Sequence, residues 1–455
     1  MTSVLLIYPF FKPRRDRSVF RFPPLGVSYI AASVRADGHD VDLIDCTFLE
    51  RNDALRRALA VKAEVIGIYC MATMLDECLW FAQQLRTHCR ILIAGGPLPT
   101  CDPEPFLEQF DVVVRGEGEQ TMLELLRAYK EGCELDDVAG IVYRADAGGP
   151  TKGRIIYTPE RGIMRDLDRI PFPARDLLPN ESYIDYARKK YGYSITTVMS
   201  TRGCPYRCEF CSNVVFGGSY RERSAQNVVD EIEAALALGY DRISFADDVF
   251  TMKKDRVVRV CQEIRRRGLR FNWECLGRVD ALDYPTALEM QEAGCKRVFF
   301  GIESGDDQIL ELMDKKITTD EARRAVNAAH RAGLLVGAFF ILCYPGETDD
   351  TVLKTLNFAT SLPLDYLGLS MPYPLPGTAL YERTKDRITR DWHPDDSPFG
   401  SHVLIFDADF SETKMWFGIL KGHVQFFIRR RMGRLAPLLL ALFEKPTDAV
   451  FRSLK

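Results

Sequence analysis

Three cysteines, Cys204, Cys208 and Cys211, lie in one short loop with the spacing C-x3-C-x2-C. Residues 194–200 before the loop form an apolar run typical of a buried strand, and residues 224–238 after it have the apolar periodicity of a helix. We therefore predict that the cysteines follow the carboxyl end of a strand. Three thiolates can bind three irons of a [4Fe–4S] cluster and leave the fourth iron open to another ligand.

Two other uses of these thiols fit less well. Structural zinc takes four protein ligands, and no fourth Cys or His follows Cys211 at a zinc-like distance. A disulfide would leave one of the three cysteines over. The chain has 13 cysteines spread along its length, which indicates a reducing compartment, and we expect a cytoplasmic protein. The amino terminus, broken by Pro9, is predicted to be a strand and not a signal peptide.

Residues 1–135 alternate short apolar runs with helical patterns. Strands are predicted near residues 4–8, 40–44, 65–69, 91–94 and 112–114, with helices near 25–36, 53–61, 76–87 and 121–129. This order is typical of an α/β fold with a doubly wound, Rossmann-like parallel sheet, which binds ligands beyond the carboxyl ends of its strands.

Three turns at those strand ends form the first candidate site. They contain Met71 and Thr73, then Gly95, Gly96 and Pro97, then Gly116 and Glu117. Glycine lets the backbone approach a large flat or phosphate-bearing ligand closely. Ordinary turn chemistry explains such glycines equally well when they are considered alone.

A second β/α series follows over residues 194–390. Strands are predicted near residues 195–200, 242–246, 270–276, 297–301, 335–342 and 366–371. Six β/α units in series predict a partial (β/α)6 barrel, with its active site at the carboxyl ends of the strands. Between the two series, residues 136–193 are predicted to form a hairpin and a proline-rich linker, and residues 391–455 a helical C-terminal domain.

Polar residues follow five of the barrel strands. The clusters are Asp247 and Asp248, Arg278, Glu303 and Ser304, residues 344–348, and residues 373–378. Each has a structural alternative: Asp248 could cap the next helix, and Thr348 could start one. Five such clusters at corresponding strand ends favour a functional site.

The cysteine motif, with Phe210 before its last cysteine, resembles the signature of the radical S-adenosylmethionine (SAM) superfamily. The resemblance implies that SAM binds the open iron and is cleaved to methionine and a 5′-deoxyadenosyl radical, which abstracts a hydrogen atom. It further implies SAM-binding roles for residues at the strand ends: Glu303 at the ribose, Asp247 or Asp248 at the amino group, Arg278 near the carboxylate or the substrate, and Phe210 and Ile341 beside the adenine. Ser304, next to Glu303, is also expected to contribute to cofactor binding. Relatives usually have glycine where Cys343 stands, and we interpret this cysteine as a small packing residue.

The first series resembles the cobalamin-binding domain of B12-dependent radical SAM enzymes. The resemblance rests on the run PPLGVSYIAASVRADGHDVDLIDC, the GGP turn and the GEGE turn. It implies that cobalamin binds at the three turns. Leu98 stands where histidine is common, and an Asp-x-His-x-x-Gly motif is absent from the sequence, so we predict cobalamin without a histidine on its lower face.

Together the two resemblances imply a cobalamin-dependent radical SAM enzyme. We favour a methyltransferase that moves a methyl group from SAM through methylcobalamin to an unactivated carbon of a small molecule, and an electron donor such as flavodoxin or ferredoxin is expected. The alternatives are an oxidative cyclase like the anaerobic cyclase of chlorophyll biosynthesis, and a non-catalytic B12 or redox sensor. A methylthiotransferase is disfavoured because the first domain has no second cysteine triad.

The C-terminal tail differs from the rest of the chain in its net charge. The formal net charge of −4 gives no case for a nucleic acid partner. Residues 411–455 nevertheless carry +6, against −10 for residues 1–410. We interpret the tail as a helical pair packed on the barrel. The alternatives are a lid over an apolar or anionic substrate, and a surface that contacts anionic lipid.

Overall fold

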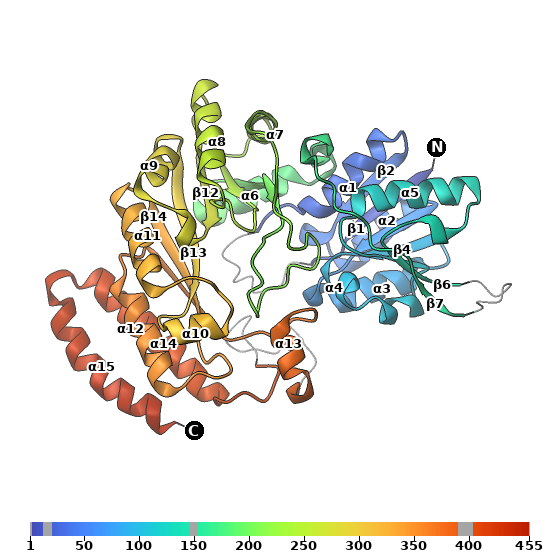
Figure 1. Cartoon of the computed structure of the whole chain (residues 1–455). Coiled ribbons are helices and arrows are strands. Elements are labelled where there is room, and N and C mark those ends of the chain that lie inside the picture. The colour runs from blue at the N-terminus through green and yellow to red at the C-terminus, as the bar shows by residue number, and fades with distance from the viewer. Residues whose placement is uncertain (1, 12–20, 146–152, 390–403, 455) are drawn as a thin grey trace. The chain divides into compact units, whose positions relative to one another are not determined.

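The computed structural model describes residues 2–11, 21–145, 153–389 and 404–454 (Figure 1). The chain divides into two compact units. The first comprises Met1–Val198 with Asn213–Arg242, and the second comprises Met199–Ser212 with Ile243–Lys455.

The first unit contains a seven-stranded sheet in the order β2-β1-β3-β4-β5-β6-β7. Its first five strands are parallel, as predicted: β1 (Ser3–Tyr8), β2 (Asp40–Asp45), β3 (Val65–Tyr69), β4 (Ile91–Gly95) and β5 (Val112–Val114). The predicted hairpin exists as β6 (Ile141–Arg144) and β7 (Ile155–Tyr157). It is not a separate connecting element, because β6 pairs antiparallel with β5 and extends the sheet.

Helices cover both faces of this sheet, because alternate residues of a strand point to opposite sides. Val4 and Leu6 of β1 share a core with α1 (Leu25–Ala36) and α5 (Gly118–Glu131). Leu5 and Ile7 share the other core with α2 (Arg51–Val61) and α3 (Leu75–Leu85). The fold is therefore doubly wound, as predicted (Figure 1).

The predicted linker contains regular structure that the sequence analysis missed. The 3-10 turn η6 (Arg175–Leu177) and α6 (Asn180–Tyr191) occupy it. Only Tyr183, Ile184 and Ala187 of α6 are buried, which is too short an apolar pattern to stand out. The Tyr183 hydroxyl donates to Asp45 Oδ2 at 2.7 Å and so ties α6 to the end of β2.

A buried ionic cluster joins distant parts of the first unit. Glu231, on α7 (Ala225–Ala237), has a fully buried side chain. It accepts hydrogen bonds from Arg175 at 2.6 Å, from Tyr29 at 3.2 Å and from Arg223. These charge-assisted contacts fix α7 against α1 and η6, since an unpaired buried charge would be costly.

The second sheet has six strands in chain order, β8-β11-β12-β13-β14-β15, which confirms the predicted partial barrel. The strands are β8 (Ile195–Val198), β11 (Arg242–Phe245), β12 (Asn272–Gly277), β13 (Cys295–Glu303), β14 (Leu335–Ile341) and β15 (Tyr366–Ser370). The pairs from β12 to β15 are parallel. Helices follow the strands of the second unit: α8 (Lys254–Arg266), α9 (Tyr284–Glu292), α11 (Thr319–Arg331) and α12 (Asp349–Ser361).

The predicted helical tail is present as α14 (Glu412–Arg431) and α15 (Ala436–Ser453). Residues 391–403, the start of the predicted tail, lie outside the described residues. Among the described residues, no helix is both long and apolar enough to cross a membrane.

Candidate active site

The three motif cysteines lie in the loop that follows β9 (Thr201–Arg202) in the second unit. Cys204 and Cys208 are half-buried and Cys211 is exposed, so a ligand can reach all three. The pKa of Cys211 is raised to about 11, first by desolvation and then by the nearby Cys208, Asp248 and Cys204. The thiols therefore lie close enough to influence one another's charge.

The donor set fits an iron–sulfur cluster better than a single ion. In the described residues, no three His, Cys, Asp or Glu side chains gather in a way that could hold one metal ion. A [4Fe–4S] cluster makes a different demand, because each thiolate binds a separate iron of the cube. Three soft thiol donors on one accessible loop meet that demand.

Arg278, at the end of β12, holds the middle of the cysteine loop. Its guanidinium lies 3.4 Å from the centre of the Tyr206 ring, and its Nε donates to Asp280 Oδ1 at 3.0 Å. The Tyr206 hydroxyl donates to the other oxygen of Asp280 at 3.0 Å. Arg278 also donates to the carbonyl oxygen of Lys315 at 2.9 Å. Arg278 thus positions the loop, a contact that the sequence analysis did not anticipate.

The last part of the loop is held by Glu209. Its carboxylate accepts from the Tyr344 hydroxyl at 2.7 Å and pairs with Arg383 at 3.2 Å. Phe210 packs against an apolar cluster that includes Ile341, the other residue expected at the adenine. The structure therefore brings Phe210 and Ile341 to the same place.

Asp247 and Asp248 have different surroundings. Asp247 is 1% exposed and accepts from the backbone N–H groups of Ser200 at 2.6 Å and Thr201 at 2.9 Å, and from the Ser200 hydroxyl. These bonds fix the start of the cysteine loop. Asp248 is exposed. Its pKa is raised, mainly by desolvation and secondly by the negative charge of Asp247. It does not cap the next helix, whose N-cap is Lys253, so that alternative is wrong.

Glu303 ends β13 in a constrained conformation, with a φ of 73°. Its Oε1 accepts from Lys315 Nζ at 3.0 Å, and both side chains are at most 10% exposed. A side chain at Gly301 would place its Cβ only 2.4 Å from that oxygen and would therefore displace the Glu303 carboxylate. Lys315 is a site residue that the sequence analysis missed.

Two other predicted positions make structural contacts. The Ser304 hydroxyl is fully buried, lies 3.0 Å from the Thr355 hydroxyl and accepts from the Asp306 N–H at 3.1 Å. Thr348 caps α12 by accepting from the Thr351 N–H at 3.3 Å, which confirms the structural alternative for this residue.

In the first unit, the three predicted turns follow the adjacent strands β3, β4 and β5. The Cys70 N–H donates to Gly95 O at 2.7 Å, and the Gly116 N–H donates to the Thr100 hydroxyl at 3.1 Å. Gly96 has a φ of 119°, and a Cβ there would lie 2.5 Å from Cys70 O. These contacts hold the turns together in a compact edge of backbone.

Other predicted residues of this edge differ in exposure. Met71, Pro97 and Gly116 are half-buried and Thr73 is exposed, so a ligand can reach them. Glu117 pairs with Arg221 at 2.5 Å, and both side chains are largely buried. Glu117 therefore anchors residues that follow the cysteine loop in sequence, a role beyond that of a simple turn residue.

Neither histidine of the first unit lies at this edge. His39 Nδ1 accepts from the Thr2 N–H at 3.3 Å, next to the amino-terminal start of β2. His88 is exposed between α3 and β4. Leu98 lies in the short helix α4 (Pro97–Cys101) and packs against the apolar core.

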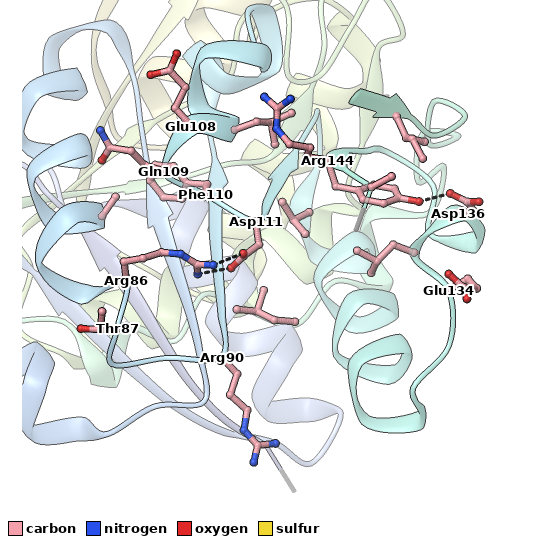
Figure 2. A pocket seen from close by; sticks show the side chains of 18 of the residues that line it. Arg86, Thr87, Arg90, Glu108, Gln109, Phe110, Asp111, Glu134, Asp136 and Arg144 are labelled. Atoms are coloured by element: carbon pink, nitrogen blue, oxygen red, sulfur yellow. Dashed lines mark hydrogen bonds and ion pairs between the residues drawn. The ribbon is translucent and has the colours of Figure 1, made fainter. Parts of the chain in front are cut away.

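A pocket of about 1100 Å³ lies at the opposite edge of the sheet, where β4 and β5 begin (Figure 2). Arg86 forms two hydrogen bonds with Asp111, each of 2.6 Å, and Tyr143 donates to Asp136. The polar side chains of this pocket hydrogen-bond to one another. The pocket therefore differs from the glycine-lined edge that was predicted to bind a cofactor.

Two family models match the chain, one in each predicted β/α series. The family model of the radical SAM superfamily matches residues 198–359, and that of the B12 binding domain matches residues 12–126. An uncharacterized methyltransferase, PH0819 of Pyrococcus horikoshii, is 34% identical over 79% of this chain and 78% of its own. The chain therefore belongs to the cobalamin-binding radical SAM enzymes, whose cofactors are a [4Fe–4S] cluster, SAM and cobalamin.

Other relatives differ in the reaction they are named for. The anaerobic magnesium-protoporphyrin IX monomethyl ester cyclase of Rubrivivax gelatinosus is 28% identical over 85% of this chain and 70% of its own. Among solved structures, the cobalamin-dependent radical SAM enzyme OxsB superposes with a TM-score of 0.75 at 18% identity, covering 99% of this chain and 72% of its own. The radical SAM methyltransferase TsrM of Kitasatospora setae gives 0.70 at 19% identity over 85% and 75%. These two structures share the fold.

Proposed function

We propose that this enzyme is a methyltransferase that acts on an unactivated carbon of a small molecule. The observation that supports this most is the 34% identity, over most of both chains, to a relative named as a methyltransferase. The cluster and SAM supply a radical that removes hydrogen, and cobalamin supplies a carrier for the methyl group.

We assign the residues that bind the cluster and SAM to the second unit and those that bind cobalamin to the first. Cys204, Cys208 and Cys211 would bind the cluster, and Arg278 and Glu209 would hold their loop in place. Phe210 and Ile341 would provide an apolar wall for the adenine, since they share one cluster. Of the two neighbouring acids, we assign the SAM amino group to Asp248, because Asp247 already accepts three hydrogen bonds from residues 200 and 201.

In the first unit, the glycine turns would hold cobalamin by close backbone approach. Gly96 and Gly116 have φ values of 119° and 73°, in a region where other side chains are strained. Met71, Thr73, Gly95, Pro97 and Glu117 complete the proposed edge. With His39 and His88 both away from it, we expect no imidazole on the lower face of the corrin.

Labelled SAM tests the proposal. The protein, loaded anaerobically with cluster and cobalamin, is incubated with metabolite extracts and SAM that carries a trideuterated methyl group. A methyltransferase gives a product heavier by one labelled methyl, together with S-adenosylhomocysteine and 5′-deoxyadenosine. The Cys208→Ala variant is the control for radical chemistry.

Oxidative cyclisation is the second candidate, favoured by 28% identity over 85% of this chain to the anaerobic cyclase. In that case 5′-deoxyadenosine forms without S-adenosylhomocysteine, and the product gains no label. That outcome would reject methyl transfer and retain the radical SAM class.

A further inference from the structure

Large apolar side chains are exposed around the turn between α14 and α15. We define residues 427–442 as the helical tip. Within it Phe427 is 58% exposed, Leu435 58%, Leu438 62% and Leu442 66%. Four large apolar side chains this exposed in one short segment differ from apolar residues scattered singly over a surface.

Two of these exposed apolar residues, Leu438 and Leu442, lie on α15. Leu438 and Leu442 are four residues apart, with exposed Lys445 three residues further on, so they share one side of the helix. The other side is used for packing, because Ala436, Leu440 and Phe451 are buried. Helix α15 contacts α14, and α14 contacts β15, so α15 is an outer layer of the second unit (Figure 1).

The tip, with four arginines, and the part of α14 before it are strongly basic. Residues 413–443 contain six Lys or Arg and no Asp or Glu. Three of these cations pair with acids on other elements or on α15: Lys414 with Asp349, Lys421 with Asp448, and Arg430 with Asp365. In the described part of the chain, no ion pair is formed by the exposed Arg429, Arg431 or Arg434.

We propose that the helical tip docks on an anionic lipid surface. Exposed Leu and Phe side chains beside unpaired arginines suit the boundary between lipid headgroups and acyl chains, where the apolar groups insert and the cations bind phosphate. A second copy of this chain fits the same face poorly, because the three arginines of one tip would meet those of the other.

Vesicle sedimentation with the full-length protein tests this. We expect binding to vesicles of phosphatidylcholine with 30% phosphatidylglycerol, weak binding to phosphatidylcholine alone, and weakening as salt rises. R431E/R434E should lower the partition by about tenfold or more, since each basic residue near an anionic surface contributes severalfold. L438S/L442S should lower it without a change of charge. R57E/R324E, which alters two exposed arginines on α2 and α11, is the matched control and should bind as the wild type does.

Absence of binding to the anionic vesicles would overturn the proposal, as would an equal loss in R57E/R324E. Self-association in ultracentrifugation that L438S/L442S abolishes, without vesicle binding, would assign the face to a second copy. Thermal unfolding checks each variant. If L438S/L442S is unstable, R431E/R434E decides, because its side chains are exposed.

Discussion

The guanidinium of Arg278 stacks on the ring of Tyr206, with 3.4 Å between the guanidinium carbon and the ring centre. Arg278→Lys keeps the charge but loses the planar contact and the paired hydrogen bonds to Asp280. We expect a less ordered cysteine loop, because loss of the cation–π contact alone removes about 0.5–2 kcal/mol of the interaction energy that holds it. Reconstituted protein should lose iron to a chelator faster than the wild type. Arg297→Lys, which alters another arginine–ring contact on Phe299, is the control and should retain iron normally.

The cluster cysteines can be tested one at a time. Cys204→Ala, Cys208→Ala or Cys211→Ala should each abolish SAM cleavage, because the cube needs all three thiolates. Cobalamin binding, measured by absorbance after gel filtration, should remain near the wild-type level. Cys133→Ala, an exposed thiol of the first unit, is the control. Normal SAM cleavage in any motif variant would reject the assignment.

Glu303 and Lys315 are expected to affect SAM differently. Glu303→Gln should weaken SAM binding by about 1.5–3 kcal/mol if the carboxylate accepts a ribose hydroxyl, because charge-assisted hydrogen bonds have that strength. Lys315→Met removes the partner cation at 3.0 Å but keeps the carboxylate, so its effect should be smaller. Calorimetric titration with SAM compares the two. A larger loss in Lys315→Met would indicate that Glu303 acts only through its ion pair.

Glu347 should make stability depend on pH. Burial raises its pKa to about 8, although the Tyr344 N–H donates to its Oε2 at 2.8 Å. Its Oε1 is buried and has no hydrogen-bond partner among the residues that the structure describes. The folded protein therefore binds a proton that the unfolded chain has released above about pH 4.5. Stability from this group is full at low pH, falls as pH rises from about 4.5 towards 8, and then levels off. Glu347→Gln should flatten that decline in denaturant unfolding, whereas exposed Glu311→Gln should not.

Cys343 has a left-handed backbone conformation, with a φ of 61°, which glycine adopts more easily than other residues. Cys343→Gly should relieve about 1–2 kcal/mol of strain but lose a buried side chain, so the change in unfolding free energy should be small. Cys343→Val should destabilise clearly, because a β-branched residue is least tolerant of this conformation. Thermal melts of the two variants decide the matter. Equal melting temperatures would show that the backbone relaxes freely here.

Much of the fold was predictable because local patterns determine it. The apolar runs that became β1 to β5 and β11 to β15 recur at β/α spacing, and the parallel order follows from that alternation. The cysteine loop was found because its three ligands are close in sequence. Helix α6 was missed because its apolar face has only three buried residues.

Contacts between residues far apart in the chain were not predictable. Nothing near Arg278 in sequence indicates that it stacks on Tyr206 or donates to Lys315 O, 37 residues away. Likewise, the sequence was equally compatible with a helix-capping role and a binding role for Asp248. Only the structure shows that the N-cap of α8 is Lys253. Such pairings depend on the tertiary fold, and a single sequence carries no record of them.

The Glu231 cluster has a consequence for how the chain is made. Arg175 reaches its carboxylate partner only when α7, 56 residues later, has been synthesised. Until then Arg175 lacks the carboxylate that neutralises it, and the Tyr29 hydroxyl lacks its acceptor. We therefore expect the first unit to complete its packing only after residues 225–237, which follow the cysteine loop, have been synthesised. A fragment ending at residue 193 would expose this unmatched surface and should fold poorly by itself.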